Sequence, residues 1–367
     1  MKIFRGYQHP QLAPHCALTI GNFDGVHRGH QAMLALLKNE AAHRGVPSCA
    51  VTFEPHPRDY FAGLARKPEL APARIATLRD KLTELERCGI DQCVILPFNA
   101  QLASQSPEAF IQQVLVRGLG ARYVLVGDDF RFGAKRAGDY AMLDAAGERL
   151  GFDVARMNSY EIPAPHARPQ LADPHGSAPA SGLPVGGRSS TRVSSSAVRE
   201  ALAQGDMGRV SALLGRRYSI SGHVVHGRKL GRELGFSTLN LRFSHWKPAA
   251  SGIFAVHVHG LADQHLPGVA NLGIRPSLNP ADVNGGRVLL ETHCLDWPAS
   301  LGQEGAYGKI IRVELLHKLH DELKYDSLAS LKSGIAKDCG DARAFFAQPF
   351  LASMHTETSR QTTRDRI

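Results

Sequence analysis

The stretch GNFDGVHRGH, from Gly21 to His30, organises the N-terminal part of this chain. It follows an apolar run, Cys16 to Ile20, that we expect to be a buried strand, and it leads into a segment with apolar residues at helical spacing. The glycines therefore lie in a strand-to-helix turn, where backbone N–H groups and the positive end of the helix dipole can approach a phosphate. His27 and His30 are three residues apart, so both rings can face one anion.

Two imidazoles at such a turn suit nucleotidyl transfer, because charge develops on the phosphorus under attack and on the departing pyrophosphate. The motif alone is a weak signal, since glycine-rich turns with a histidine are common. Its context strengthens the hypothesis: the turn lies at the carboxyl end of a strand, where doubly wound sheets bind their ligands.

At 367 residues the chain is long enough for two domains, and contents of 43% hydrophobic and 21% charged residues are typical of a globular protein. No apolar run is long enough to span a bilayer, and the N-terminus has no apolar core of a signal peptide. The six cysteines are scattered without Cys-x-x-Cys pairs, which favours reduced thiols in a cytoplasm over disulfides or a zinc site.

The net charge of +9 suits either nucleic acid or phosphorylated small molecules. The basic residues are dispersed and aromatic residues make up only 7%, so neither a basic run nor a stacking platform is evident. We therefore expect small-molecule substrates, no nucleic acid and no membrane. The sequence does not indicate an oligomeric state.

Strand and helix patterns alternate in the first part of the chain, which predicts a parallel sheet covered on both faces. A stretch rich in Pro, Ala, Gly and Ser follows at 163–190, where we expect a flexible insertion, and two short helices should end at Gly215. The expected strands are at 48–53, 93–98, 123–127 and 152–157; the expected helices start near Ile75, after Ser106 and near Tyr140.

Beyond Arg216 the apolar residues alternate with a period of two between glycine- and proline-rich turns, which predicts an antiparallel barrel or sandwich. A closing helix is expected at 326–346 and a disordered tail at 351–367. The predicted architecture is a Rossmann-like α/β domain at 1–214 and a mostly β domain at 215–350.

Three further segments carry side chains suited to ligand binding. In GDDFRFG, Phe130 and Phe132 fit either an ordinary core or stacking on a flat ring. Ser194 to Ser196 open a helix that also carries Arg199, which suits either a phosphate site or a plain serine cap. Glu291 is an acid within the apolar strand LLETHCL, where alternation alone would favour a surface position.

Together these segments resemble the bacterial bifunctional riboflavin kinase/FAD synthetase family. GNFDGVHRGH, FEPHP, VGDDFRFG and SSSAVREAL are similar to its FAD synthetase motifs, and they occur in the family's order. GHVVHGRKLGRELGFSTLNL, GVANLGIRPS, LETHCLDW and YGKIIRVELL are similar to its riboflavin kinase motifs. The resemblance implies a nucleotidyltransferase domain followed by a kinase barrel, with ATP, Mg²⁺ and flavins as ligands.

By that resemblance, the first domain transfers an adenylyl group from ATP to FMN, and the second phosphorylates riboflavin with ATP. Catalytic roles would fall to His27, His30 and Glu291, the last as general base for the riboflavin 5′-hydroxyl. Thr238 and Asn240 would hold Mg²⁺. Nucleotide or phosphate would be bound by Gly21, Asn22, Asp24, Gly25, Gly29, Asp129, Ser194, Ser195, Ser196, Arg199, Gly227, Arg228, Lys229, Gly231 and Gly235; flavin would be bound by Phe130, Phe132, Asn271 and Arg275.

Some positions depart from the family pattern. Ser237 and Leu239 stand where proline and alanine are usual, and the added bulk of Leu239 beside the metal site favours a weaker kinase. His320 stands where arginine is usual near the flavin. An adenylyltransferase with a weak or inactive kinase is therefore the first alternative. A flavin-sensing or RNA-binding protein on the same scaffold, and an adenylyltransferase for another substrate, are two further alternatives.

Overall fold

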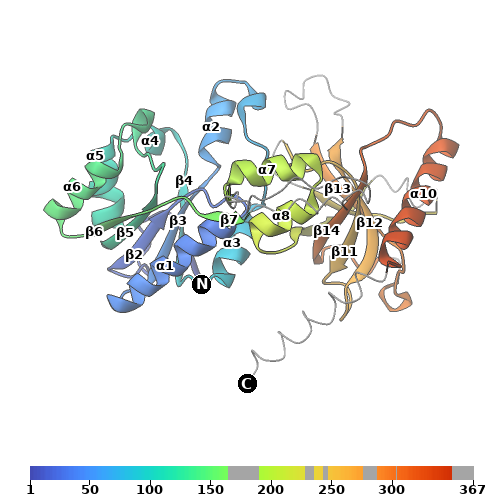
Figure 1. Cartoon of the computed structure of the whole chain (residues 1–367), viewed down its shortest axis with the longest axis horizontal. Helices are drawn as coiled ribbons and strands as arrows, with labels where there is room; N and C mark the ends of the chain where they lie inside the picture. The colour runs from blue at the N-terminus through green and yellow to red at the C-terminus, as the bar shows by residue number, and fades with distance from the viewer. Residues whose placement is uncertain (164–189, 228–234, 243–246, 276–286, 303, 349–367) are drawn as a thin grey trace, which may run out of the picture.

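The computed structural model describes residues 1–163, 190–227, 235–242, 247–275, 287–302 and 304–348. The expected insertion, except for its two ends, and the expected tail lie outside this part, as do Arg228, Lys229 and Gly231 and the side chain of Arg275. An α/β unit and a β-barrel lie side by side, with two short helices between them (Figure 1).

The N-terminal unit is a six-stranded parallel sheet in the order β1-β4-β3-β2-β5-β6. The predicted parallel sheet is confirmed, and β1 adds an edge strand that the sequence analysis did not identify. β2 lies between β3 and β5, where the strand order reverses, so the turn that follows β2 opens at the expected ligand-binding edge. The strands are β1 (Lys2–Arg5), β2 (Cys16–Ile20), β3 (Ser48–Glu54), β4 (Gln92–Pro97), β5 (Ala121–Gly127) and β6 (Asp153–Met157).

Helices cover both faces of this sheet (Figure 1). Leu34 and Leu85 pack with Ala17 in one apolar cluster, whereas Leu115 and Leu143 pack in another on the opposite face. Alternate residues of β2 enter the two clusters, as the period of two of a strand requires. One face is covered by α1 (Arg28–His43) and α3 (Leu78–Arg87); the other by α5 (Pro107–Phe110), its π-helical continuation Ile111–Gly118 and α6 (Tyr140–Leu150).

The helix expected from Ile75 begins later, and the expectation is wrong at this end. α3 starts at Leu78 because Thr77 caps it, accepting a hydrogen bond from the backbone N–H of Asp80 at 3.1 Å. Ile75 lies in the segment before the helix, where its N–H donates to the Asp24 carboxylate. The sequence analysis also missed α2 (Pro57–Leu64), α4 (Ala100–Ala103) and a two-stranded sheet of β7 (Glu161–Pro163) and β8 (Ser190–Arg192).

The C-terminal strands close into an antiparallel barrel in the order β10-β13-β12-β11-β14-β9, which decides between barrel and sandwich. α10 (Leu328–Phe346) packs beside β11 and β12, as Figure 1 shows, and starts two residues later than expected because Ser327 caps it. The strands are β9 (Tyr218–Val225), β10 (Leu239–Arg242), β11 (Gly252–His259), β12 (Leu266–Arg275), β13 (Arg287–Cys294) and β14 (Ile310–His320).

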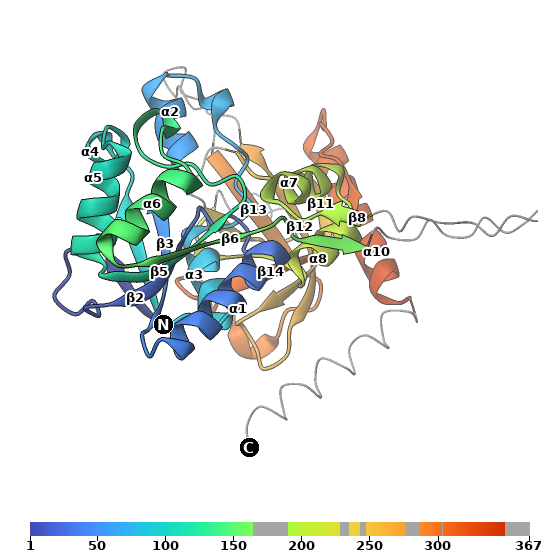
Figure 2. The ribbon, with the colours of Figure 1, turned by 60° about the vertical axis from the view of Figure 1, so that its left-hand side comes forward.

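The two expected helices, α7 (Ser195–Gln204) and α8 (Met207–Leu214), lie between the sheet and the barrel (Figure 1). α8 contacts β9 and β14, and Figure 2 shows both helices against the barrel. Their buried residues Val198 and Leu213 share one hydrophobic core with Leu241 and Leu290 of the barrel. The two helices and the barrel therefore share one apolar core, which Ile75 also enters, whereas the two faces of the parallel sheet form clusters of their own.

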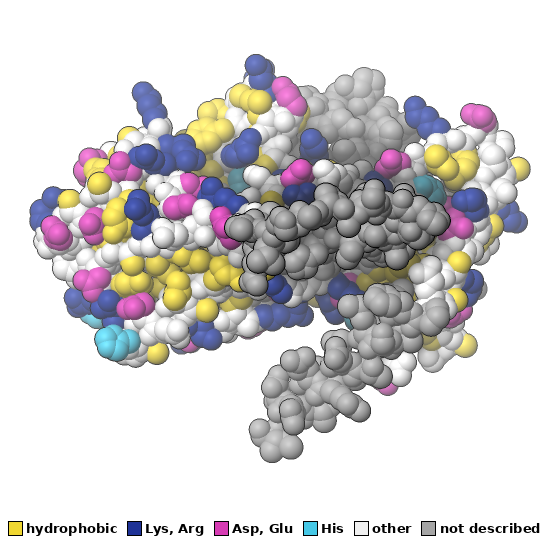
Figure 3. Space-filling view, in the orientation of Figure 1, with side chains coloured by type: hydrophobic (Ala, Val, Ile, Leu, Met, Phe, Trp, Pro, Cys, Tyr) yellow, Lys and Arg dark blue, Asp and Glu magenta, His cyan; other side chains and the backbone are white. Residues whose placement is uncertain are grey.

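All six cysteines are free thiols. Among the described residues no helix is both long and apolar enough to cross a membrane. On the face seen in Figure 3, Lys and Arg side chains are interspersed with Asp and Glu over the described part of the chain.

Candidate functional site

His27 and His30 meet at the N-terminus of α1. His27 is the N-cap: its Nδ1 accepts a hydrogen bond from the His30 backbone N–H at 3.3 Å, and the two rings stack with centroids 3.7 Å apart. His27 is 6% exposed, and burial lowers its pKa to about 4. Burial and the neighbouring His27 hold the pKa of His30 well below its ordinary value. Both rings are therefore neutral at pH 7.

The Nδ1 atom of His30 is buried and has no hydrogen-bond partner among the described residues. An unsatisfied buried polar atom is costly and is found mainly where a ligand or water completes it. It lies at the start of a helix, where anions are stabilised. The stacking brings the two rings together, as their spacing of three residues predicts, and their joint role at a phosphate stays a prediction.

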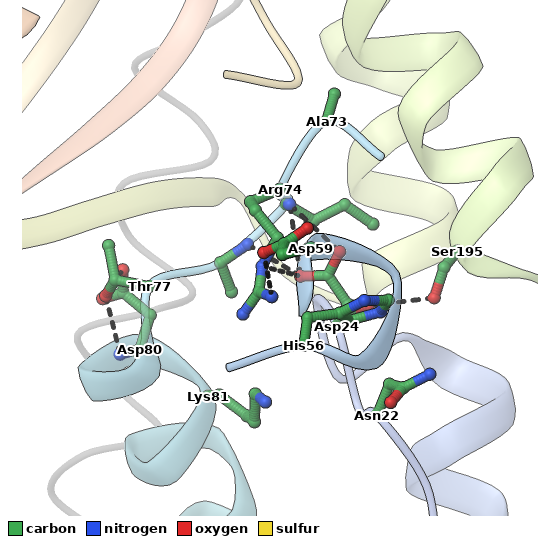
Figure 4. A network of polar contacts seen from close by, with 12 residues as sticks. Asn22, Asp24, His56, Asp59, Ala73, Arg74, Thr77, Asp80, Lys81 and Ser195 are labelled. Atoms are coloured by element: carbon green, nitrogen blue, oxygen red, sulfur yellow. Dashed lines mark hydrogen bonds and ion pairs between the residues drawn. The ribbon is translucent and has the colours of Figure 1, made fainter. Parts of the chain in front are cut away.

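Asp24 lies in the same turn and is bound entirely by the protein (Figure 4). Its buried carboxylate accepts hydrogen bonds from the N–H groups of Ile75 and Ala76, both at 3.2 Å, and from Arg199 Nη2 at 2.7 Å. Burial alone would raise its pKa, but the cations Arg74 and Arg199 lower it overall. The carboxylate is therefore ionised and holds the turn in place.

The donors of Arg199 are likewise bound by acceptors within the protein. Its Nε donates to the Ala73 carbonyl at 2.7 Å, in addition to the Nη2 bond to Asp24. The Ser195 hydroxyl donates to the Asp24 carbonyl at 3.1 Å, whereas Ser194 is the N-cap of α7 and Ser196 is exposed. The structure thus joins the SSSAVREAL and GNFDGVHRGH motifs directly, and phosphate contacts of Asp24 and Arg199 stay a prediction.

The GDDFRFG segment follows β5. Asp129 is exposed at the end of the strand, and Phe130 is partly buried. Phe132 is 7% exposed, stacks on Phe130 at 5.3 Å between centroids and packs against Phe110. Of the two interpretations left open, the core role fits Phe132, so the structure offers no exposed face of this ring to a flavin. Phe130 keeps the partly accessible position that stacking needs.

Two buried side chains near this turn, Lys81 and Arg74, escaped the sequence analysis as candidates, and a third, His56, entered it only within the FEPHP motif. Lys81 is fully buried, donates to the Thr52 hydroxyl at 3.3 Å, and has its pKa lowered to about 8 by burial and by Arg74. Arg74 pairs with Asp59 at 3.1 Å, and His56 caps α2. A signal for Lys81 was present, since it falls on the apolar face of its helix between leucines.

A cavity of about 470 Å³ opens beside these residues. Acidic Glu54 and Asp59 line it together with the ring of Tyr60 and the cations Arg74 and Lys247. Its volume is in the range of small-molecule sites. Lys247 comes from the segment before β11, so both halves of the chain contribute to its wall.

In the barrel, strand register brings together residues far apart in the sequence. Asn240 of β10 pairs with Glu291 of β13, and Glu291 pairs with Asn271 of β12 on its other side. Directly paired residues point to the same face of a sheet. The neighbouring row of Leu241, Leu290 and Leu272 belongs to the apolar core, so the three polar residues share the outer face.

The amide oxygens of Asn240 and Asn271 are both buried and without a hydrogen-bond partner among the described residues. Asn240 is 4% exposed, and its Nδ2 donates to the Thr238 carbonyl at 3.3 Å. Gly227 backs onto it so closely that a Cβ there would lie 2.5 Å from Nδ2. A buried amide oxygen without a hydrogen-bond partner is a suitable ligand for a hard cation such as Mg²⁺.

The departures from the family pattern have structural consequences. Leu239 is 7% exposed and belongs to the barrel core, one residue away from the face that carries Asn240. Its bulk is therefore directed away from the expected metal position, and the expected overpacking there is not found. Ser237 contributes its carbonyl to a 2.9 Å hydrogen bond with His293 Nδ1. His320 Nε2 binds Asp338 at 2.8 Å and so ties β14 to α10.

Comparison with known proteins assigns each half of the chain to a protein family. The FAD synthetase family model matches residues 9–165 and the riboflavin kinase family model matches residues 214–346. A bifunctional riboflavin kinase/FMN adenylyltransferase of Haemophilus influenzae is 38% identical over 94% of this chain and 99% of its own. The Escherichia coli K12 protein of the same description is 40% identical over 94% and 98%, and that of Pseudomonas fluorescens 39% over 95% and 98%.

A solved structure described as a macrolide-efflux protein from Streptococcus pneumoniae superposes with a TM-score of 0.65 and covers 94% of this chain and 99% of that chain. At 22% identity this likeness concerns the fold alone. Fold, site and family models together define an FAD synthetase domain joined to a riboflavin kinase domain. The chain belongs to the bifunctional riboflavin kinase/FMN adenylyltransferase family, which confirms the resemblance inferred from its motifs.

Proposed function

We propose that His27 and His30 receive the triphosphate of ATP during adenylyl transfer, in a chain that phosphorylates riboflavin to FMN and then adenylylates FMN to FAD. The unpartnered Nδ1 of His30 at the N-terminus of α1 is the observation that carries this assignment. Gly21, Asn22, Gly25 and Gly29 shape the turn around it.

In the first domain an FMN phosphate oxygen attacks the α-phosphorus of ATP, and pyrophosphate leaves. No covalent intermediate with the protein is needed, because positioning and charge stabilisation can supply the rate. The two neutral imidazoles and the free N–H groups of α1 face the charge that develops. The cavity beside Tyr60, at the end of β3, supports a place for the flavin, and the partly buried Phe130 follows β5 on the other side of β2.

In the second domain Glu291 takes the proton of the riboflavin 5′-hydroxyl as that oxygen attacks the γ-phosphorus of ATP, and ADP leaves. Asn240 and Thr238 hold Mg²⁺, which neutralises phosphate charge when bound. Asn271, on the other side of Glu291, orients the flavin. The shared outer face of Asn240, Glu291 and Asn271 supports this division of roles.

We also propose that the domain boundary lies near residue 214, where the riboflavin kinase match begins. Six free thiols support a reducing, cytoplasmic compartment. The substrates are small molecules.

The test is product analysis: purified protein with riboflavin, ATP and Mg²⁺, followed over time by chromatography. We expect FMN to appear first and then to give way to FAD. If added FMN becomes FAD while riboflavin stays unchanged, the kinase assignment is wrong for this chain and the adenylyltransferase alternative holds. If neither flavin changes, both assignments fail.

A further inference from the structure

Arg216, in the link between α8 and β9, reaches across to the GNFDGVHRGH turn. Its Nη2 donates to the Gly25 carbonyl at 2.7 Å and its Nη1 to the Val26 carbonyl at 3.2 Å. Its Nε pairs with Glu84 of α3 at 3.1 Å, which fixes the guanidinium from behind. These two carbonyls belong to the residues that directly precede His27. A residue of the segment matched by the riboflavin kinase model therefore binds the turn that carries the proposed adenylyl-transfer site.

Gln31 fastens the same two segments. Its Nε2 donates to the Val26 carbonyl at 2.8 Å and to the Leu214 carbonyl at 2.7 Å. Val26 thus receives donors from both Arg216 and Gln31, one on each side of the domain junction. The turn is therefore bound to the end of α8 and not only to its own sheet.

A second route runs from the barrel to Asp24. The Tyr218 hydroxyl on β9 donates to the Ile75 carbonyl at 2.9 Å, and the N–H groups of Ile75 and Ala76 donate to the Asp24 carboxylate. Tyr218 is buried, and burial raises the pKa of its hydroxyl, so the group stays a donor. The chain of contacts from Tyr218 through Ile75 to Asp24 again ends in the turn.

The turn needs such support because its backbone is strained. Val26, a β-branched residue, has φ of +40°, and Phe23 has φ of +48°, a region that such side chains rarely adopt. Strained conformations persist only where surrounding contacts determine them. Gly25 has φ of +86°, and a Cβ there would lie 2.8 Å from the Ile75 side chain. The contacts from Arg216 and Ile75 surround the strained residues.

We propose that Arg216 and Tyr218, both within the segment matched by the riboflavin kinase model, are positioning residues for adenylyl transfer at the other site. They hold Gly25, Val26 and Ile75 so that His27 and His30 face the triphosphate. The inference rests on the proposed role of these two histidines. If so, the start of the barrel helps to hold the site of adenylyl transfer in shape, although the two reactions take place at separate sites.

The decisive variant is Arg216→Met in the full chain, which keeps the aliphatic stem and removes the donors. Its matched control is Arg217→Met, since Arg217 is the next residue and pairs with Glu314 of the barrel at 3.4 Å. Loss of the two charge-assisted hydrogen bonds to the turn, together with those to Leu214 and Glu84, should lower kcat for FMN adenylylation by about tenfold or more. The KM for FMN, the melting temperature and riboflavin phosphorylation should match those of the Arg217 variant.

Two further measurements keep the inference testable if Arg216→Met folds poorly. Tyr218→Phe keeps the buried ring and removes only the hydroxyl, so kcat for adenylylation should fall with the kinase unaffected. Arg216→Lys, which can serve one carbonyl, should give an intermediate kcat. Hydrogen exchange of the backbone amides at 21–30 should be faster in Tyr218→Phe and in Arg216→Lys than in the unaltered chain, whereas exchange of the barrel amides should be unchanged.

Unchanged adenylylation in Arg216→Met and Tyr218→Phe would overturn the inference, as would an equal loss of both activities. The proposed function is tested separately by His27→Asn, because asparagine keeps the helix cap and removes the imidazole. If His27→Asn forms FAD as fast as the unaltered chain, the proposed function fails. If it is impaired while Arg216→Met is fully active, only the present inference fails.

Discussion

The two candidate sites treat their buried oxygen atoms in opposite ways. In the α/β unit the Asp24 carboxylate receives two backbone N–H groups and the Arg199 guanidinium. In the barrel the amide oxygens of Asn240 and Asn271 are buried with no partner among the described residues. The protein itself satisfies the carboxylate, whereas it leaves the two amide oxygens to the ligands that we propose for them.

This difference indicates a structural role for the carboxylate and a ligand-binding role for the two amides. A satisfied buried carboxylate stabilises the position of a backbone turn, so its loss should affect folding as well as activity. An unsatisfied amide costs stability and is retained where a ligand completes it. We therefore expect changes in the barrel site to alter phosphorylation alone, and changes at Asp24 to alter stability as well.

The largest effect is expected for Glu291→Gln, which keeps the shape of the side chain and removes its basicity. Riboflavin phosphorylation should fall about 10²- to 10⁴-fold, the range for a positioned general base. FMN adenylylation by the same preparation should be unchanged. His30→Gln should give the reverse pattern, with FAD formation lost and FMN formation kept. Both are measured by chromatography of the flavins; a parallel loss in either variant would refute the separation of sites.

Next comes Asp24→Ala, which leaves Arg199 without its carboxylate partner and removes one of the carboxylates that face the buried Arg74. Breaking a buried ion pair costs about 3 kcal/mol of unfolding free energy. Asp59→Ala is the control: it also pairs with Arg74, but its side chain is 22% exposed, and the cost should be smaller. Urea unfolding of the full chain measures both. Equal costs for the two variants would show that Asp24 does not support the turn.

A smaller effect is expected for Asn240→Ala. The Mg²⁺ concentration for half-maximal riboflavin phosphorylation should rise about tenfold, which corresponds to roughly 1.4 kcal/mol of binding free energy. Asn271→Ala removes the matching amide on the other side of Glu291 and should raise the KM for riboflavin without changing the Mg²⁺ requirement. If Asn271→Ala shifts the Mg²⁺ curve and Asn240→Ala does not, the two roles are assigned the wrong way round.

The sequence was sufficient to predict the parallel sheet, the two short helices and the β-rich second half, because period and turn residues are local signals. It also placed His27 beside His30, since three residues at a helix start leave little freedom. The meeting of Asn240, Glu291 and Asn271 depends on strand register, which local patterns leave open. The motifs identified these residues through family resemblance and not through geometry.

The contacts of Arg216 and Lys81 could not be predicted in the same way. A lysine among leucines suggests burial, but its partner Thr52 lies on another strand and is chosen by tertiary packing. Arg216 and Arg217 are adjacent and chemically alike, yet one reaches the α/β turn and the other the barrel. Only the arrangement of the two units distinguishes them. Ile75 shows the same limit, because a helical pattern was outweighed by its hydrogen bond to Asp24.

The smallest effect concerns protons at His27. Its pKa is lowered from 6.5 to about 4, so in the free protein at pH 7 the ring is neutral. Because the unfolded chain takes up this proton first, the free energy of unfolding should fall as the pH drops from 6.5 towards 4. A triphosphate beside the ring acts in the opposite direction, since a nearby negative charge favours the protonated form and raises the pKa.

ATP binding should therefore be coupled to proton uptake, and ATP should bind more tightly at pH 5.5 than at pH 7.5. Titration calorimetry in two buffers of different ionisation enthalpy measures the protons taken up. His27→Asn keeps the cap of α1 but cannot be protonated, so subtracting its signal removes the titration of the nucleotide itself and the contribution of the kinase site. If the unaltered chain and His27→Asn take up the same number of protons, His27 does not face the triphosphate. Another group of the α/β unit must then contact the triphosphate of ATP.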